Sequence, residues 1–153
     1  MNDFNKFIAT KTGKGLLVIV LLAIGFFSGM EYKTYQIKKS IASISNSIND
    51  SRIKGDDAMV KADISNLRAQ IEIYSAANGD SYNGACSNPD VLALLNSAEN
   101  AGGGSYVCNV SSDGKSYAVA TPLKSNPETS FCVDSTGQAI TINQPLGSAT
   151  VCR

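Results

Sequence analysis

The amino-acid sequence predicts an α+β fold in which a long N-terminal helical spine, transmembrane and then amphipathic, packs on a small disulfide-bonded antiparallel β-meander. Three observations predict this fold. An uncharged apolar run near the N-terminus leads into apolar residues at helical spacing. Short alternating segments separated by turn residues follow in the second half of the chain. All four cysteines also lie in that half, at positions Cys86, Cys108, Cys132 and Cys152.

The first element is a short basic leader followed by a candidate membrane span. Residues 1–14 carry three lysines against one acidic residue, and residues 15–30 carry no charge. This order predicts a leader or cytoplasmic tail over 1–14 and a transmembrane segment over 15–32. Two alternatives stay open. One is a buried core helix, although no face of the run is polar, and the other is a signal peptide cleaved near Ser28-Gly29.

Charge alone does not orient this span. Three lysines lie on each side of it, so the positive-inside rule gives a tie. The cysteines lie on the carboxyl side, and disulfides form in oxidising compartments. We therefore expect the N-terminus in the cytoplasm and the cysteine-containing part outside.

Residues 33–55 are predicted to form a helical stalk. Ile37, Ile41, Ile44 and Ile48 are spaced four, three and four residues apart, which places them on one side of a helix. Such a stripe must contact another copy or a neighbouring element. A break or bend is expected over 49–55, because Gly55 disfavours a helix interior.

Residues 56–153 are predicted to form a head domain that includes its own packing helix. Asp56 is the expected cap of this helix, and Asn78-Gly79 its expected end. Apolar residues at helical spacing form the face expected to cover the sheet, namely Val60, Ile64, Leu67, Ile71 and Tyr74. A short helix is expected over 91–96 and a loop over 122–129. Strands are expected over 106–110, 116–121, 130–134 and 138–142.

The cysteines are expected to form two disulfides. Sequence order favours Cys86 with Cys108 and Cys132 with Cys152, although four cysteines allow three connectivities and sequence alone does not choose. Four buried free thiols are the alternative. The chain has neither a histidine nor a CxxC pair, so no zinc or other metal site is expected.

The composition also argues against several classes of protein. Lys+Arg and Asp+Glu both total 13, so the chain lacks the basic excess of a nucleic-acid binder. The absence of histidine removes the commonest general base. No phosphate-binding loop is present, because Gly102–Gly104 lacks the following Lys-Ser/Thr. We expect no enzymatic activity, no cofactor and no small-molecule substrate.

The whole layout resembles the type IV pilin and pseudopilin family over about residues 13–142. The best local match covers 57–64 and continues through Leu67, Ile71, Tyr74, Asn78, Gly79 and Tyr82. Residues 131–137 (FCVDSTG) resemble the last strands of many pilin-like proteins. The resemblance implies a structural subunit of an extracellular filament. Its implied partners are further copies or other pilin-like subunits, the bacterial cytoplasmic membrane and the assembly machinery. An assembled filament would lie at the cell surface.

The resemblance also implies particular site residues near the N-terminus. Leader-peptidase cleavage is expected at Gly15, after Lys14, with Gly13 as the second choice. The family usually continues with Phe-Thr-Leu-Ile-Glu, whereas Val20 stands at the position of the glutamate here. This departure supports an alternative: an uncleaved, single-pass accessory protein with an extracytoplasmic binding domain. Packing between subunits is expected through Leu17, Val20, Ile24, Ile37, Ile41, Ile44 and Ile48.

Overall fold

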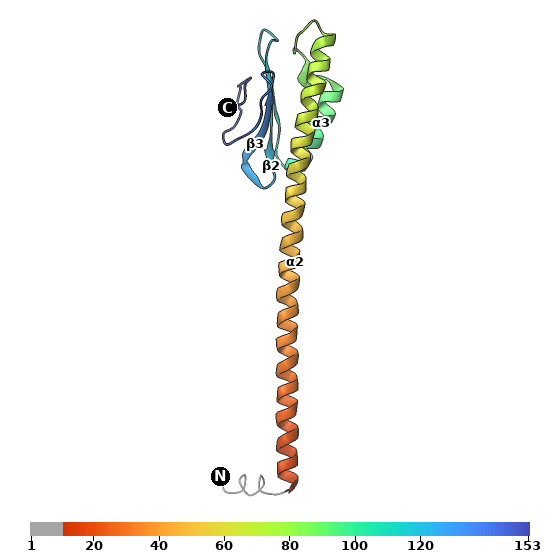
Figure 1. The fold of residues 1–153 in the computed structure, drawn as a ribbon, viewed down its shortest axis with the longest axis vertical. Helices are drawn as coiled ribbons and strands as arrows, with labels where there is room; N and C mark the ends of the chain where they lie inside the picture. Colours follow the sequence, from red (N-terminus) through yellow and green to blue (C-terminus); the bar gives the residue numbers. More distant parts are fainter. Residues whose placement is uncertain (1–10) are drawn as a thin grey trace. The chain divides into compact units, whose positions relative to one another are not determined.

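The computed structural model describes residues 11–153 and divides the chain into two compact units, Met1–Ile48 and Asn49–Arg153. The first unit is helical from Lys11 onward, and the second contains the sheet (Figure 1). The long N-terminal helix, the antiparallel sheet against which it packs and the two disulfides agree with the predicted α+β fold.

Helix α2 spans Lys11–Ala77 without interruption, so the break predicted over 49–55 is wrong. Gly55 lies within the helix and has open space around it. One interior glycine costs only about 1 kcal/mol relative to alanine, which is too little to end a helix supported on its C-terminal side by buried apolar residues. Asp56 therefore caps no new helix. Its carboxylate instead forms a salt bridge with Lys124, with 3.8 Å between Nζ and Oδ2.

The C-terminal part of α2 packs on the sheet as predicted. Val60, Ile64, Leu67 and Ile71 are fully buried, and they share one hydrophobic cluster with strand residues that include Val119. Tyr74 is partly buried against the same cluster. Repetition every three or four residues keeps these side chains on one face of the helix, which explains why a single helix covers the sheet.

Two short helices follow α2. Gly79 takes a left-handed conformation, with φ of 68°, just beyond the end of the long helix. The 3-10 helix η1 (Ala85–Ser87) then leads into α3 (Pro89–Gly102), which is longer at both ends than the helix predicted over 91–96. The Asn88 side chain caps α3 by accepting hydrogen bonds from the next backbone N–H groups, and Pro89 suits the first turn. These signals explain the earlier start of α3, and its later end follows from Ala98 and Ala101, which are buried in the core cluster before the left-handed Gly103.

The sheet is a four-stranded antiparallel meander in the order β1-β2-β3-β4. Its strands are β1 (Val107–Val110), β2 (Tyr117–Leu123), β3 (Asn126–Asp134) and β4 (Ala139–Ile142). The loop predicted over 122–129 is wrong, because Leu123 pairs with Asn126 and only a tight turn separates the strands. Pro122 suggested a loop because it lacks a backbone N–H. It lies instead at a register shift, where a strand tolerates proline.

Different parts of the chain cover the two faces of the sheet. Tyr117 and Val119 belong to the cluster that contains the α2 and α3 side chains. Ala118 and Ala120 alternate with them and belong to a second cluster. That cluster includes Leu146 and Cys152 of the segment after β4, which lies on the side of the sheet away from α2 (Figure 1). The C-terminal segment 143–153, called the strap below, therefore forms a third layer.

Candidate functional site

Helix α2 contains a segment that is long and apolar enough to cross a membrane. The most apolar window has a mean hydropathy of 1.8, and none of it is buried against other described residues. A buried core helix, one of the alternatives above, does not fit this exposure. A signal sequence passes the same test of length and composition, so it remains the alternative.

The predicted cleavage position lies within the same helix. Lys14 and Gly15 fall in α2, but the surroundings of both residues are outside the described part of the structure, as are residues 1–10. Leu17, Val20 and Ile24 are all exposed, with relative exposures of 39%, 48% and 57%. These three side chains can contact lipid or protein.

The isoleucine stripe of the predicted stalk is also exposed. Ile37, Ile41, Ile44 and Ile48 have relative exposures of 58–60%. Three of them and Ser45 line a shallow groove of about 290 Å³. Ser40, Ser45 and Ser47 lie three or four residues from stripe isoleucines, so small uncharged side chains border it. The arrangement suits close contact with another apolar helix.

The seven predicted packing residues do not share one face of the helix. At about 100° per residue, Ile24 lies about 140° from Ile37 around the helix axis, and Leu17 and Val20 lie on the side of Ile24. Ile19, Phe26 and Met30 instead align with the isoleucines, and all three are exposed. The signal for this longer stripe was present in the sequence, because Phe26, Ile37 and Ile48 repeat every eleven residues.

The two disulfides join Cys86 to Cys108 and Cys132 to Cys152, which is the pairing that sequence order favours. The first connects η1 to β1, and the second connects β3 to the strap. No cysteine in the described chain is free, so the alternative of four thiols does not hold. The disulfides thus fix both the entry to the sheet and the last residues of the protein.

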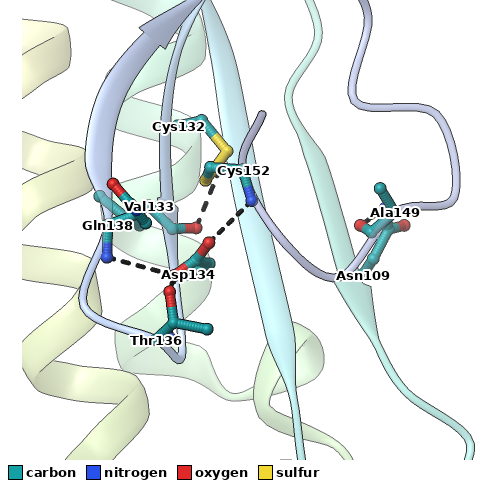
Figure 2. The surroundings of a disulfide bond; sticks show 8 residues. All are labelled: Asn109, Cys132, Val133, Asp134, Thr136, Gln138, Ala149 and Cys152. Atoms are coloured by element: carbon teal, nitrogen blue, oxygen red, sulfur yellow. Dashed lines mark hydrogen bonds between the residues drawn. A yellow bond between two sulfur atoms is a disulfide. The ribbon is translucent and has the colours of Figure 1, made fainter.

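Asp134 joins the end of β3 to the strap, as Figure 2 shows. Its Oδ2 accepts a hydrogen bond of 2.7 Å from the backbone N–H of Cys152. Its Oδ1 accepts from the backbone N–H and the hydroxyl of Thr136 and from the backbone N–H of Gln138. Burial alone would raise the pKa of this carboxyl, but these hydrogen bonds outweigh burial and hold the pKa below its ordinary value.

This lowered pKa predicts a loss of stability in acid. An unperturbed aspartate has a pKa of about 3.9, so folding favours the ionised Asp134. Its contribution is complete above that pH and is lost as the pH falls through the folded-state pKa. Urea denaturation at a series of pH values below about 5 measures the free energy of unfolding. As the pH falls, this free energy is expected to decrease more steeply for the wild type than for Asp134→Asn. An equal decrease in the two proteins would contradict this prediction. Asp80→Asn, at an exposed position just beyond the end of α2, provides the matched control.

A second polar cluster fixes α2 to the sheet. The Tyr117 hydroxyl donates to Glu72 Oε1 over 3.2 Å, and the Tyr82 hydroxyl donates to Glu72 Oε2 over 3.0 Å. Burial, together with the nearby Glu72 carboxylate, raises the pKa of Tyr117 strongly. Arg68 Nη1 donates to the Gly137 carbonyl in the β3–β4 turn. These contacts have a structural role, because the hydroxyl proton of each of the two tyrosines is already donated to the Glu72 carboxylate.

The turn between β2 and β3 is likewise fixed to α2. Besides the Lys124–Asp56 salt bridge, the backbone N–H and hydroxyl of Ser125 donate to the Asp57 carboxylate. The acidic residues at the start of the predicted second helix therefore hold this hairpin. The spacing of apolar residues gave no signal for this contact, because it joins residues 68 positions apart.

Comparisons of the chain with protein-family models, with curated proteins and with solved structures found no match. The fold and the exposed helix therefore carry the functional argument.

Proposed function

We propose that this protein is a structural, pilin-like subunit of an extracellular filament of the type IV pilus family. The main support is the uncovered apolar face of α2 in the first unit, combined with a disulfide-bonded α+β domain in the second. The apolar helix is stored in the bacterial cytoplasmic membrane with its N-terminus inside. On assembly, the same helix packs against other subunits, and the head lies outside the cell.

A second candidate follows from Val20. In the filament family a glutamate at this position is thought to pair with the free amino terminus of a neighbouring subunit, and valine leaves that charge without a partner. The alternative is an uncleaved, single-pass accessory protein whose extracytoplasmic head binds a partner of a secretion or DNA-uptake machine. Both candidates place the chain in the same membrane.

The proposal includes no catalysis and no cofactor. Among the described residues, no three His, Cys, Asp or Glu side chains are placed to hold a metal ion. A cavity of about 230 Å³ beside the strap has Glu128 as its one charged lining residue among the side chains described there. A lone exposed carboxylate without a neighbouring base is poorly suited to acid–base chemistry.

The isoleucine stripe provides the test of filament assembly. Ile44→Asp combined with Ile48→Asp places two carboxylates on the stripe, where packing would bury them without partners. We expect the amount of protein in sheared surface fractions to fall at least about tenfold, because 1.4 kcal/mol already corresponds to that factor. Immunoblotting of sheared and membrane fractions, with electron microscopy of the sheared material, measures the effect.

A matched variant adds the same charge on the opposite side of the helix. Ala42→Asp combined with Asn46→Asp keeps the four-residue spacing but avoids the stripe. This control is expected to retain filaments at the wild-type level. Equal amounts of filament from both double variants would contradict packing through the stripe.

Mass spectrometry of the mature N-terminus separates the two candidates. A new terminus at Leu16 supports the subunit, because cleavage at Gly15 is expected to release the leader. An intact leader together with sheared fractions that contain no filament would overturn the subunit proposal and favour the anchored accessory protein.

A further inference from the structure

We infer that Asp134 is a positioning residue for disulfide formation, whose carboxylate holds the strap so that Cys152 pairs with Cys132 and not with another cysteine. This role is independent of the proposed filament.

One strand holds Cys152 at two points. Cys132 and Asp134 are two residues apart on β3, and they pair with Ala120 and Ala118 of β2, so both project from the same face of the sheet. Cys132 binds the Cys152 side chain through the disulfide. Asp134 binds the Cys152 backbone N–H over 2.7 Å (Figure 2). The hydrogen bond therefore fixes the same residue that must deliver its sulfur to Cys132.

The carboxylate is oriented by residues close to it in the chain. Thr136 donates to Oδ1 from its backbone N–H (2.9 Å) and its hydroxyl (2.7 Å), and Gln138 donates from its backbone N–H (3.2 Å). These donors lie within four positions of Asp134, in the turn between β3 and β4. The turn can therefore orient the side chain before the distant strap arrives.

A carboxylate is required because both oxygens accept hydrogen bonds. An asparagine offers one acceptor oxygen and one NH₂ donor group. If the asparagine oxygen accepted the hydrogen bonds from Thr136 and Gln138, the asparagine NH₂ group would face the backbone N–H of Cys152. Both of these groups are donors, so no hydrogen bond could form between them. Asp134→Asn thus removes the hold on Cys152 while keeping nearly the same size and shape.

Asn109 provides an independent, uncharged hold on the strap. Its Nδ2 donates to the carbonyls of Gly147 and Ala149, each over 2.8 Å. These carbonyls lie before Cys152 in the chain, and Asn109 does not contact Cys152 among the hydrogen bonds described for it. Asn109→Ala therefore loosens the strap without touching the positioning contact.

Pairing is ordinary thiol–disulfide exchange with an external disulfide as the oxidant. The Cys132 thiolate attacks glutathione disulfide, forms a mixed disulfide and releases one glutathione thiolate. The Cys152 thiolate then attacks the Cys132 sulfur and releases the second glutathione. Both protein thiols are oxidised, and one glutathione disulfide is reduced to two glutathione thiolates, which take up the two protons that the protein thiols gave to solvent. Asp134 acts on the second step, by keeping Cys152 close to the mixed disulfide.

The test follows each disulfide separately during oxidative refolding. The full chain in detergent is reduced, denatured and refolded in a glutathione buffer, and samples are quenched by alkylation and mapped by mass spectrometry. In Asp134→Asn, we expect the Cys132–Cys152 bond to form about tenfold more slowly, equivalent to about 1.4 kcal/mol. The Cys86–Cys108 bond is expected to form at the wild-type rate.

Two further variants separate positioning from general destabilisation. Asn109→Ala is expected to retain fast closure of Cys132–Cys152, and Asp134→Glu is expected to recover part of the rate lost in Asp134→Asn. Three outcomes would overturn the inference: unchanged closure in Asp134→Asn, an equal slowing of both disulfides, or the same selective loss in Asn109→Ala.

Discussion

The Leu67→Ala variant is expected to lower the free energy of unfolding of the head by about 2–5 kcal/mol. Leu67 is fully buried in the cluster that joins α2, α3 and the sheet. Truncation removes its apolar contacts and leaves a cavity that the surrounding helices and strands fill only in part. Urea denaturation of the full chain in detergent, followed by tyrosine fluorescence, measures the change, since the protein has no tryptophan.

Ile73→Ala is the matched control for this substitution. Ile73 lies on the same helix but is 62% exposed. Its truncation is expected to change the free energy of unfolding by no more than about 0.5 kcal/mol. Similar losses in the two variants would show that α2 does not pack on the sheet through the face described above.

Removal of the first disulfide is expected to have an effect of similar size. Cys86→Ser combined with Cys108→Ser opens a loop of 22 residues. The loop-entropy model gives a loss of about 3 kcal/mol in the free energy of unfolding, because the unfolded chain gains conformational freedom. The comparison with the wild type is made by urea denaturation under oxidising conditions.

The same comparison in excess reductant is the control. Both proteins then lack disulfides, so the difference of about 3 kcal/mol is expected to disappear. A difference that persists in reductant would mean that the serines disturb packing around η1 and β1, and that the covalent link itself contributes little.

Patterns of apolar residues and turns were sufficient to predict the main architecture. The spacing of Val60, Ile64, Leu67 and Ile71 identified the helix face that covers the sheet, because helical periodicity is local. Alternation and turn residues similarly identified a meander of four strands. Sequence order favoured the observed disulfides, since each cysteine pairs with its neighbour along the chain.

The features that the prediction missed depend on contacts between distant residues. The strap after β4 lacks regular periodicity, and its role as a third layer depends on the outer face formed by Ala118 and Ala120. The continuity of α2 through Gly55 depends on the small cost of one interior glycine relative to the stabilisation of the helix by packing farther along the chain. The hairpin over 122–129 forms despite two prolines, one of them at a register shift.

The placement of the cysteines also limits how far the oxidised head can be stretched. A force applied between α2 and Arg153 passes from Cys86 directly to Cys108, and later from Cys132 directly to Cys152. The two bypassed segments, with separations of 22 and 20 residues, cannot lengthen while the disulfides are closed. At about 3.4 Å per residue, the closed disulfides prevent these two segments from adding about 140 Å to the extended length of the chain. After its sheet has opened, the oxidised head can therefore lengthen only through the unbridged segments, chiefly the stretch from Cys108 to Cys132, which lies outside both loops.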